Sequence, residues 1–267
     1  MQTVSVVSQL RSFYRRRIAI PVGHDALVLD VGSGDKPHWR ADVLLDRYVG
    51  EEHGGQRSGR SAVRIDRPLF DADAAAMPFA DGVFDYVICS HVLEHVERPD
   101  AVIAEMVRVG KAGYIEVPEA ASAKIVDFPS HLWWVTLDDG VLVFTAKSAP
   151  YFDADIDRYL SDSGMRQPLA DLLDKHLDHR VIELSWRGKV ACKVVGSPPP
   201  DLVDAAHAAD AQHRRTETMV GRLVTSVVTL PLWRRRRRRP VQYDDIVRPD
   251  LRTGSGDTLN ARVYWVG

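Results

Sequence analysis

The segment of residues 71–97 constrains the fold of this chain more than any other stretch of its sequence. It contains a strand end at Asp73, a turn at Met77-Pro78-Phe79 and an apolar strand over residues 84–89, which runs directly into Ser90-His91-Val92-Leu93-Glu94-His95. An acid at one strand tip and histidines after the next strand are typical of the ligand crevice along the carboxyl edge of a parallel sheet. The segment therefore predicts an α/β fold with a binding site at that edge.

Strands and helices alternate through the first half of the chain. Alternation of this kind builds βαβ units, in which the strands run parallel. We therefore predict a Rossmann-like, doubly wound, mostly parallel sheet, with an antiparallel edge hairpin and a helical C-terminal extension. The expected strands cover residues 26–31, 41–46, 68–73, 84–89 and 114–117, and Pro99 opens a helix expected over residues 99–109.

Two hairpins are expected in the second half. Asp138-Asp139-Gly140 lies between two apolar runs, so the sequence predicts a hairpin in an insertion covering residues 128–146. Residues 181–186 and 189–195 flank Arg187-Gly188 as a second hairpin, which we place at the antiparallel edge of the sheet. The expected division is an N-terminal helix in residues 1–20, the main domain in residues 21–196, and a helical, basic extension in residues 197–267 with its helix near residues 201–230.

The net charge, the cysteines and the lengths of the apolar runs indicate the cellular compartment of the protein. A formal net charge of −2 supplies no global field toward nucleic acid or an anionic membrane. Cys89 and Cys192 lie in apolar, strand-like runs, so we expect reduced core thiols and no disulfide scaffold. Residues 1–21 are too polar for a signal peptide, and no run reaches the roughly 20 apolar residues of a membrane-spanning helix. We therefore expect a cytoplasmic protein.

Gly32-Ser33-Gly34 follows the first expected strand. Glycines at such a turn let the backbone pass close to a ligand, although a tight turn without a ligand is the alternative. Pro37 stands where a dinucleotide-binding fingerprint has its third glycine, which disfavours a nicotinamide cofactor. Only residues 33–40 separate the turn from the next strand, so either the first helix of the fold is reduced to a turn or the second strand is misplaced.

Three segments together resemble one family of enzymes. They are Val28-Leu29-Asp30-Val31-Gly32-Ser33-Gly34, Asp73-Ala74 followed by Met77-Pro78-Phe79, and His91-Val92-Leu93-Glu94-His95. With them the chain resembles a class I S-adenosylmethionine-dependent methyltransferase of the type 11 branch, over about residues 26–118. The resemblance implies an enzyme that uses S-adenosyl-L-methionine as its cofactor.

The resemblance also implies which residues contact the cofactor. The glycine turn would wrap its amino-acid part, Asp46 would accept from the ribose hydroxyls, and Asp73 would accept from the adenine amino group. A solvated loop acid is the alternative for Asp46, a helix or turn cap is the alternative for Asp73, and Asp71 competes with Asp73. The implied cofactor-binding residues are Asp30, Gly32, Ser33, Gly34, Asp46, Asp73, Ala74, Met77, Ser90 and His91.

The sequence from His91 to His95 supports two kinds of chemistry. It fits a zinc-peptidase pattern, and its spacing would place His91, Glu94 and His95 on neighbouring parts of a helix. That pattern belongs inside a helix, whereas here it directly follows a buried strand, so we predict no metal ligands. An imidazole near neutral pH suits removal of a hydroxyl proton. We therefore predict catalytic roles for His91, Glu94 and His95, with His91 first, and packing or capping is the alternative for at least one histidine.

Residues outside the resembling segments are expected to bind the methyl acceptor. His131, Trp133 and Trp134 are the candidate substrate residues, because paired indoles can stack on a sugar or another planar face. Anchoring of the hairpin is the alternative for the tryptophans. We predict methyl transfer to an oxygen of a small molecule, a glycan or a lipid-linked glycan. A non-catalytic methyltransferase-like scaffold and a nucleic-acid methyltransferase are the alternative functions.

A basic run follows the apolar stretch of the extension. Residues 223–233 are mostly apolar and end in Trp233, and six arginines follow at residues 234–239. The combination predicts peripheral contact with the inner membrane surface through residues 223–239. A solvated basic stretch is the alternative, and nucleic-acid binding is less favoured.

Overall fold

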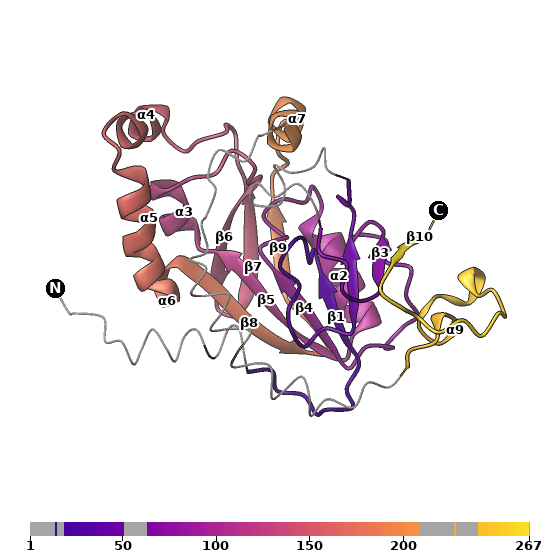
Figure 1. The fold of residues 1–267 in the computed structure, drawn as a ribbon. Coiled ribbons are helices and arrows are strands. Elements are labelled where there is room, and N and C mark those ends of the chain that lie inside the picture. The colour runs from indigo at the N-terminus through magenta and orange to yellow at the C-terminus, as the bar shows by residue number, and fades with distance from the viewer. Residues whose placement is uncertain (1–13, 15–18, 51–62, 209–226, 228–239, 267) are drawn as a thin grey trace.

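A computed structural model describes residues 14, 19–50, 63–208, 227 and 240–266 of the chain (Figure 1). The N-terminal helix expected in residues 1–20 lies almost wholly outside these ranges, as does most of the helix expected near residues 201–230. The arginine run at residues 234–239 also lies outside them, so its membrane contact stays a prediction. Within the described residues, no helix is long and apolar enough to cross a bilayer.

The main sheet has seven strands in the order β10-β3-β2-β1-β4-β5-β8. All neighbouring strands pair in parallel except β8, which runs antiparallel to β5. The predicted α/β class and mostly parallel sheet are therefore confirmed. The strands are β1 (Val28–Val31), β2 (Val43–Asp46), β3 (Leu69–Asp71), β4 (Tyr86–Ser90), β5 (Ala112–Pro118), β8 (Val181–Arg187) and β10 (Val263–Trp265).

The direction of strand addition reverses at β1, which lies between β2 and β4. Every residue of β1 and β2 is buried, as expected of central strands covered on both faces. Connections diverge at such a reversal, and ligands of open α/β sheets bind there. The glycine turn follows β1 and the polar segment of residues 90–95 follows β4, so the topology brings the two together.

No helix separates β1 from β2. Residues 32–42 connect the two strands through turns, and β2 lies within the expected residues 41–46, so of the two alternatives the first helix is the one that is reduced. Arg40 stabilises this short connection, because its buried guanidinium donates to the carbonyls of Gly23 and Ala26 and to the carboxylate of Asp42. Hydrogen bonds to one charged side chain therefore stabilise this connection in place of a packed helix.

Helix α2 (Pro99–Val109) has the expected bounds and packs its apolar face on the sheet. Arg108 in its last turn donates to the carbonyls of Met77 and Phe79. Glu105, one turn earlier, accepts from the Met77 N–H at 2.7 Å. These bonds hold the turn at residues 77–79 against α2.

A second, smaller sheet has three strands in the order β6-β7-β9. Its hairpin joins β6 (Trp133–Asp138) to β7 (Val141–Ala146) and confirms the hairpin expected within residues 128–146. Asp139 and Gly140 at its turn both have positive φ, 49° and 82°, as a two-residue hairpin turn requires.

The antiparallel edge of the main sheet is confirmed in β8, but the hairpin partner expected for it lies elsewhere. Residues 192–195 form β9 (Cys192–Val195), which pairs in parallel with β7 in the smaller sheet. Arg187 and Lys189 share one isolated bridge before the strands separate. Pairing with β9 covers the open edge of β7, and a local turn pattern cannot reveal which of two open edges a strand will join.

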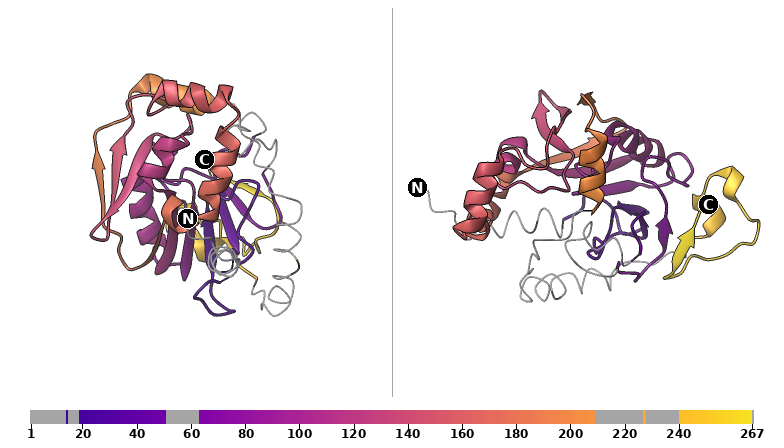
Figure 2. Two further views of the ribbon diagram at one scale, coloured as in Figure 1. Left: turned by 90° about the vertical axis from the view of Figure 1, so that its left-hand side faces the viewer. Right: turned by 90° about the horizontal axis from the view of Figure 1, so that it is seen from above.

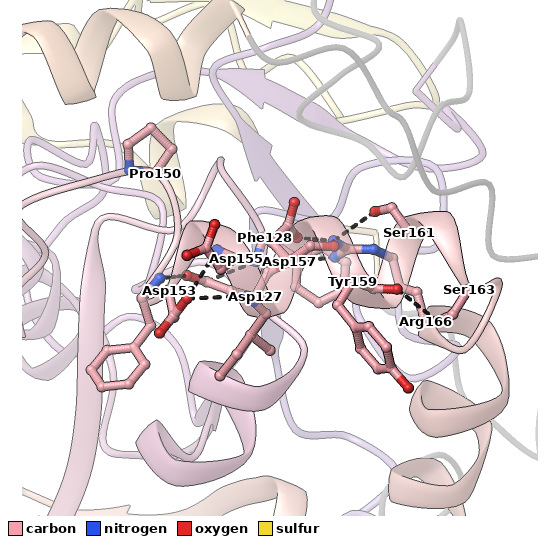
Figure 3. Close-up of polar contacts among 12 residues, drawn as sticks. Asp127, Phe128, Pro150, Asp153, Asp155, Asp157, Tyr159, Ser161, Ser163 and Arg166 are labelled. Carbon is pink, nitrogen blue, oxygen red and sulfur yellow. Dashed lines mark hydrogen bonds and ion pairs between the residues drawn. The ribbon is translucent and has the colours of Figure 1, made fainter.

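Four helices not expected from the sequence gather at the end of the molecule away from β3 and β10 (Figures 1 and 2). They are α3 (Ala120–Ile125), α4 (Ala154–Asp162), α5 (Arg166–Lys175) and α6 (Leu177–Arg180). Figure 3 shows that Asp153 caps the first turn of α4, where it accepts from the Asp155 N–H at 2.9 Å. Arg166 at the start of α5 reaches back to Asp157 and Ser161.

The extension returns to the main sheet, which was not expected. Its strand β10 pairs in parallel with β3 and forms the edge of the sheet (Figures 1 and 2). Tyr264 stacks on Phe70 of β3, with ring centroids 5.1 Å apart. The division of the chain at residue 197 stays a prediction. The other described elements of the extension are α7 (Pro200–Ala208), α9 (Tyr243–Ile246) and η2 (Pro249–Leu251).

Candidate functional site

The glycine turn after β1 packs directly against the segment after β4. Gly32 has a φ of 68°, and a Cβ placed there would lie 2.3 Å from Cγ2 of Val92. Gly34 also has a positive φ of 51°, and its N–H donates to Asp46 Oδ2 at 2.8 Å. Both positions therefore need the conformational freedom of glycine, and Gly32 needs its lack of a side chain as well.

Acids at the tips of β1 and β2 hold this turn. Asp30 is buried and accepts from the N–H of His38 at 2.7 Å, across the shortened connection. Asp46 is also buried, and its two oxygens accept from the N–H groups of Gly34 and Tyr48 at 2.8 and 2.9 Å. A carboxylate oxygen has more than one acceptor position, so Asp46 keeps capacity for the hydroxyls of a ligand.

Ser33 places a hydroxyl inside the turn. The residue is 7% exposed, and its Oγ has no hydrogen-bond partner among the described residues. A buried polar atom without a partner carries a desolvation cost, which a polar group of a ligand would relieve. An orphaned hydroxyl between two glycines of positive φ fits a turn that wraps a polar ligand.

Asp73 lies just beyond the end of β3, the strand that pairs with β2. Its side chain is 47% exposed, pairs with Arg47 at 2.9 Å and accepts from the Ala75 N–H at 2.8 Å. Ala74 is half-buried beside it, and Met77 is fully buried. The bond to Ala75 is the turn cap considered as an alternative for Asp73, and the exposed carboxylate also remains accessible to a ligand.

His91 is held between two carboxylates. Its backbone has a φ of 56°, in the left-handed region that few residues other than glycine adopt. Nδ1 lies 3.1 Å from Glu94 Oε1, and Nε2 lies 2.9 Å from Glu116 Oε1. Burial opposes protonation of the ring, but the hydrogen bonds to Glu116 and Glu94 outweigh it and raise the pKa of His91 to about 9.

Glu116 on β5 completes this cluster and was not expected in it. It is buried and lies opposite Ser90 in the register of β4 and β5. Its oxygens accept from the hydroxyls of Ser90 at 3.2 Å and Tyr114 at 2.7 Å. The one available signal was an acid inside an otherwise apolar strand.

Residues 91–97 form turns and bends, so the helix that the zinc-peptidase pattern requires for His91, Glu94 and His95 does not form there. The positive φ of His91 ends β4 and prevents a helix from starting there, and the next helix begins at Pro99. Glu94 is fully buried in this arrangement. Its Oε2 has no hydrogen-bond partner among the described residues.

His95 and His131 meet beside Glu94. His95 Nδ1 lies 2.9 Å from the Ser130 carbonyl oxygen, which makes Nδ1 the donor because a carbonyl only accepts. The two imidazole rings lie edge to face with centroids 4.8 Å apart. His131 is buried, and its Nδ1 has no partner in the described part of the chain. Burial lowers the pKa of His131 well below its ordinary value.

The two tryptophans of the hairpin face opposite sides of β6, as alternation along a strand requires. Trp133 is buried and donates its indole N–H to the Val96 carbonyl at 2.8 Å, which anchors the hairpin to the segment after β4. Trp134 is half-buried, with Lys147 Nζ 4.6 Å from its ring centre and the Phe152 ring 5.9 Å away. The structure therefore brings His131 to the site and leaves Trp134 on the other face of β6.

Residues 46–115 match a protein family described as a methyltransferase domain. An uncharacterised methyltransferase of Mycobacterium avium strain 104 is 38% identical over 96 residues, which cover 34% of this chain and 37% of that protein. The demethylmenaquinone methyltransferase of Renibacterium salmoninarum is 36% identical over 95 residues, which cover 36% and 40%. The chain thus spans about two fifths of the length of these relatives. The match to the solved structure of the YcgJ protein of Bacillus subtilis covers 47% of this chain and 61% of that protein, with 17% identity and a TM-score of 0.32.

Proposed function

We propose, because residues 46–115 belong to the methyltransferase domain family, that this protein transfers the methyl group of S-adenosyl-L-methionine to an oxygen of a small molecule, a glycan or a lipid-linked glycan. The resemblance noted in the sequence is confirmed over those residues. The observation that carries the proposal is the meeting of the glycine turn, Asp46 and residues 91–95 at one edge of the sheet.

The donor and acceptor groups at this edge suit the cofactor. Ser33 Oγ and the backbone of the glycine turn suit its charged amino-acid end. The carboxylate of Asp46 suits the vicinal ribose hydroxyls, and the exposed carboxylate of Asp73 suits the adenine amino group. S-Adenosyl-L-methionine supplies a methyl group on a sulfonium, which is a good leaving group. The protein contributes alignment of the acceptor and exclusion of water.

We assign removal of the acceptor proton to His95 and a positioning role to His91. A proton acceptor needs a ring nitrogen with a lone pair. Both ring nitrogens of His91 lie within 3.1 Å of carboxylate oxygens, so its ring holds Glu94 and Glu116 in place. His95 donates through Nδ1 to Ser130, which leaves a lone pair on Nε2 of the neutral ring. Glu94 lies between the two rings and orients both.

We assign binding of the methyl acceptor to the part of the site beside His131. An oxygen acceptor is favoured because two imidazoles, those of His95 and His131, lie beside a buried carboxylate. One relative is named for demethylmenaquinone, so a demethylated quinone is a suitable acceptor to assay beside other hydroxyl-bearing and quinone acceptors. Peripheral contact of residues 223–239 with a membrane would bring a lipid-linked acceptor within reach and remains part of the proposal.

Calorimetry with S-adenosyl-L-methionine and S-adenosylhomocysteine tests the proposed function. We expect one site per chain, and roughly ten- to hundred-fold weaker binding in Asp46→Asn and Asp73→Ala, because each variant loses a charged hydrogen-bond acceptor. Asp250→Ala, at an exposed acid of η2, is the matched control and should bind as tightly as the unchanged protein.

Three outcomes would change the assignment. No binding at millimolar ligand, or equal affinity in all three variants, would contradict the proposed cofactor site. Binding without methyl transfer to any class of acceptor would favour a non-catalytic scaffold. Salt-dependent binding of RNA would favour a nucleic-acid methyltransferase.

A further inference from the structure

Glu94, His95 and His131 form a cluster with two polar atoms that methyl transfer leaves without a role. In the described part of the chain, these residues are the one group of at least three potential metal ligands, and their ligand atoms all lie within 4.8 Å of one another. Glu94 Oε2 and His131 Nδ1 are buried and lack hydrogen-bond partners among the same residues. Such orphaned atoms are uncommon in folded proteins, and an ion bound between them would satisfy both.

We propose that Glu94, His95 and His131 bind a divalent first-row transition metal, with zinc as the expected ion. Two imidazole nitrogens and one carboxylate are a ligand set that zinc accepts, with a fourth position left open. The set differs from the peptidase pattern in the sequence, because His91 is engaged by Glu94 and Glu116 and His131 takes its place. No metal was expected from the sequence, because the peptidase pattern directly follows a buried strand there, and nothing in the sequence connects His131 to the segment after β4.

The backbone holds the two ligand-bearing segments together. Next to His131, the Leu132 N–H donates to the Glu94 carbonyl at 2.7 Å. The indole of Trp133 bonds to Val96 at 2.8 Å on the other side of His95. Ligand atoms of a tetrahedral zinc at its usual bond lengths lie roughly 3.4 Å apart. Side-chain rotations that move the ligand atoms by about an ångström would therefore bring all three to bonding distance of an ion.

Neighbouring hydrogen bonds already orient two of the three ligands. His95 donates through Nδ1 to the Ser130 carbonyl, which leaves Nε2 for an ion. His91 engages Glu94 Oε1, which leaves Oε2. Outer hydrogen bonds of this kind are typical of metal-bound histidines and carboxylates. An ion on Nε2 would occupy the lone pair assigned above to proton removal, so His95 is the base in the metal-free protein and a ligand in the metal-loaded protein.

Zinc titration of the full chain after treatment with a chelator tests the site. We expect one zinc per chain, and binding about tenfold weaker or more in His131→Phe and Glu94→Gln, because each variant removes one ligand. His24→Ala, at an exposed histidine outside the cluster, is the matched control and should keep the affinity of the unchanged protein. Cobalt in place of zinc should give visible ligand-field absorption, which His131→Phe should lose. Magnesium should not compete, because it prefers octahedral oxygen ligands.

Circular dichroism and thermal melting separate loss of a ligand from loss of the fold. If His131→Phe does not fold, the zinc affinities of Glu94→Gln and His95→Gln are compared with that of the unchanged protein instead. The absence of a saturable zinc site, or the same affinity in His24→Ala and in the cluster variants, would overturn the proposal. Binding of S-adenosyl-L-methionine is measured in the presence of chelator, so failure of the metal site leaves the proposed function standing and failure of the cofactor site leaves the metal site standing.

Discussion

Single residues fix the candidate site because they lie where two segments of the chain meet. Gly32 lets Val92 approach the turn after β1, and Asp46 holds that turn through the N–H of Gly34. Glu94 joins the segment after β4 to the strand that carries Trp133, through its carbonyl and the adjacent Leu132 N–H. A substitution at Gly32 or Asp46 therefore changes two segments at once.

Replacement of Gly32 by alanine should destabilise the protein by about 2–4 kcal/mol, as the sum of a left-handed backbone and an overpacked contact. The contact is with Val92, which would lie 2.3 Å from the new Cβ. Gly82 is the matched control, since its φ is 60° but nothing lies within 4 Å of a Cβ there. Gly82→Ala should show the backbone cost alone. Urea unfolding measures both, and equal losses would contradict the role given to Val92.

Asp85 should make stability depend on pH in the acid range. Partial burial would raise the pKa of Asp85, but the hydrogen bonds from Lys111 and the Leu27 N–H outweigh it and lower that pKa. A carboxyl whose pKa is lowered by folding stabilises the protein above its unfolded pKa of about 4, and this contribution is lost as the pH falls through the folded value.

Asp85→Asn should therefore unfold at lower urea than the unchanged protein at neutral pH. The difference in the free energy of unfolding should narrow as the pH is lowered from about 5 to about 3. Asp250→Asn, at an exposed ion pair with Arg248, should show no such narrowing. A difference that stays constant over this range would contradict the assignment.

At the scale of elements, buried polar contacts join the hairpin of the smaller sheet to the helices beyond it. Lys147, just after β7, donates through Nζ to both oxygens of Asp127 at 2.9 Å and to the Pro150 carbonyl at 2.7 Å. Figure 3 shows Asp127 beside Asp153 at the start of α4. Burial raises the pKa of Asp127 and lowers the pKa of Lys147, so burial opposes the ion pair and the hydrogen bonds between the two offset only part of that cost.

Lys147→Met should cost roughly 3–5 kcal/mol, because Asp127 would remain buried without its partner. The double variant Lys147→Met with Asp127→Asn should lose less, since no unpaired charge is left. Arg158→Ala, at an exposed pair with Asp155, is the control and should change stability by less than about 1 kcal/mol. Equal losses in the single and double variants, measured by urea unfolding, would contradict the account.

The edge strand β10 should contribute to stability through one face only. Tyr264 is buried against Phe70, whereas its neighbour Trp265 is 74% exposed. Tyr264→Ala should therefore cost about 3 kcal/mol, as for other buried aromatic residues. Trp265→Ala, in the same strand, should cost less than about 0.5 kcal/mol. Similar losses in the two variants would show that β10 does not pack as described.

Across the whole molecule, one hydrophobic cluster contains residues of both sheets. Leu29 and Val87 of the main sheet belong to it together with Trp133 and Phe144 of the smaller sheet. The site lies where the connections of both sheets meet, as the bond between Leu132 and Glu94 shows. Ligands bound there should therefore stabilise the fold as a unit and not one sheet alone.

S-Adenosylhomocysteine should raise the melting temperature of the whole protein in one transition. At a concentration of 100 times its Kd, the expected gain in the free energy of unfolding is roughly 2.7 kcal/mol. Asp73→Ala should show a smaller gain at the same concentration, and Asp250→Ala should match the unchanged protein. Differential scanning calorimetry measures this, and a gain that is the same in all three proteins would contradict the site.

Helices and turns that depend on neighbouring residues could be predicted from the sequence. Helix α2 has the expected bounds because Pro99 opens it and its buried face repeats at helical spacing. The hairpin turn at Asp139-Gly140 follows from residues that tolerate positive φ. Helix α4 was not expected, although Ile156, Tyr159 and Leu160 recur at helical spacing, because its nine residues are shorter than the window over which such a pattern is read.

The residues of the candidate site also divide into those predictable from local sequence and those that depend on long-range contacts. Asp30, Asp46 and the glycine turn lie at the expected edge, since each lies at or directly after the end of a buried strand. Glu116 was not expected, because its approach to His91 depends on the register of two neighbouring strands. The roles of these residues stay predictions, and the calorimetry and zinc titrations above test them.

Hydrophobic periodicity and glycine turns act over a few residues, so they specify the α/β class, the central strands and the edge where the site lies before any long-range contact is known. Long-range pairing alone brings His131 beside Glu94, sends β9 to the smaller sheet and places β10 next to β3. These contacts join residues far apart in the chain, and they depend on which open strand edges and buried surfaces compete for each segment. No local pattern contains that competition, which is resolved only when the whole chain packs.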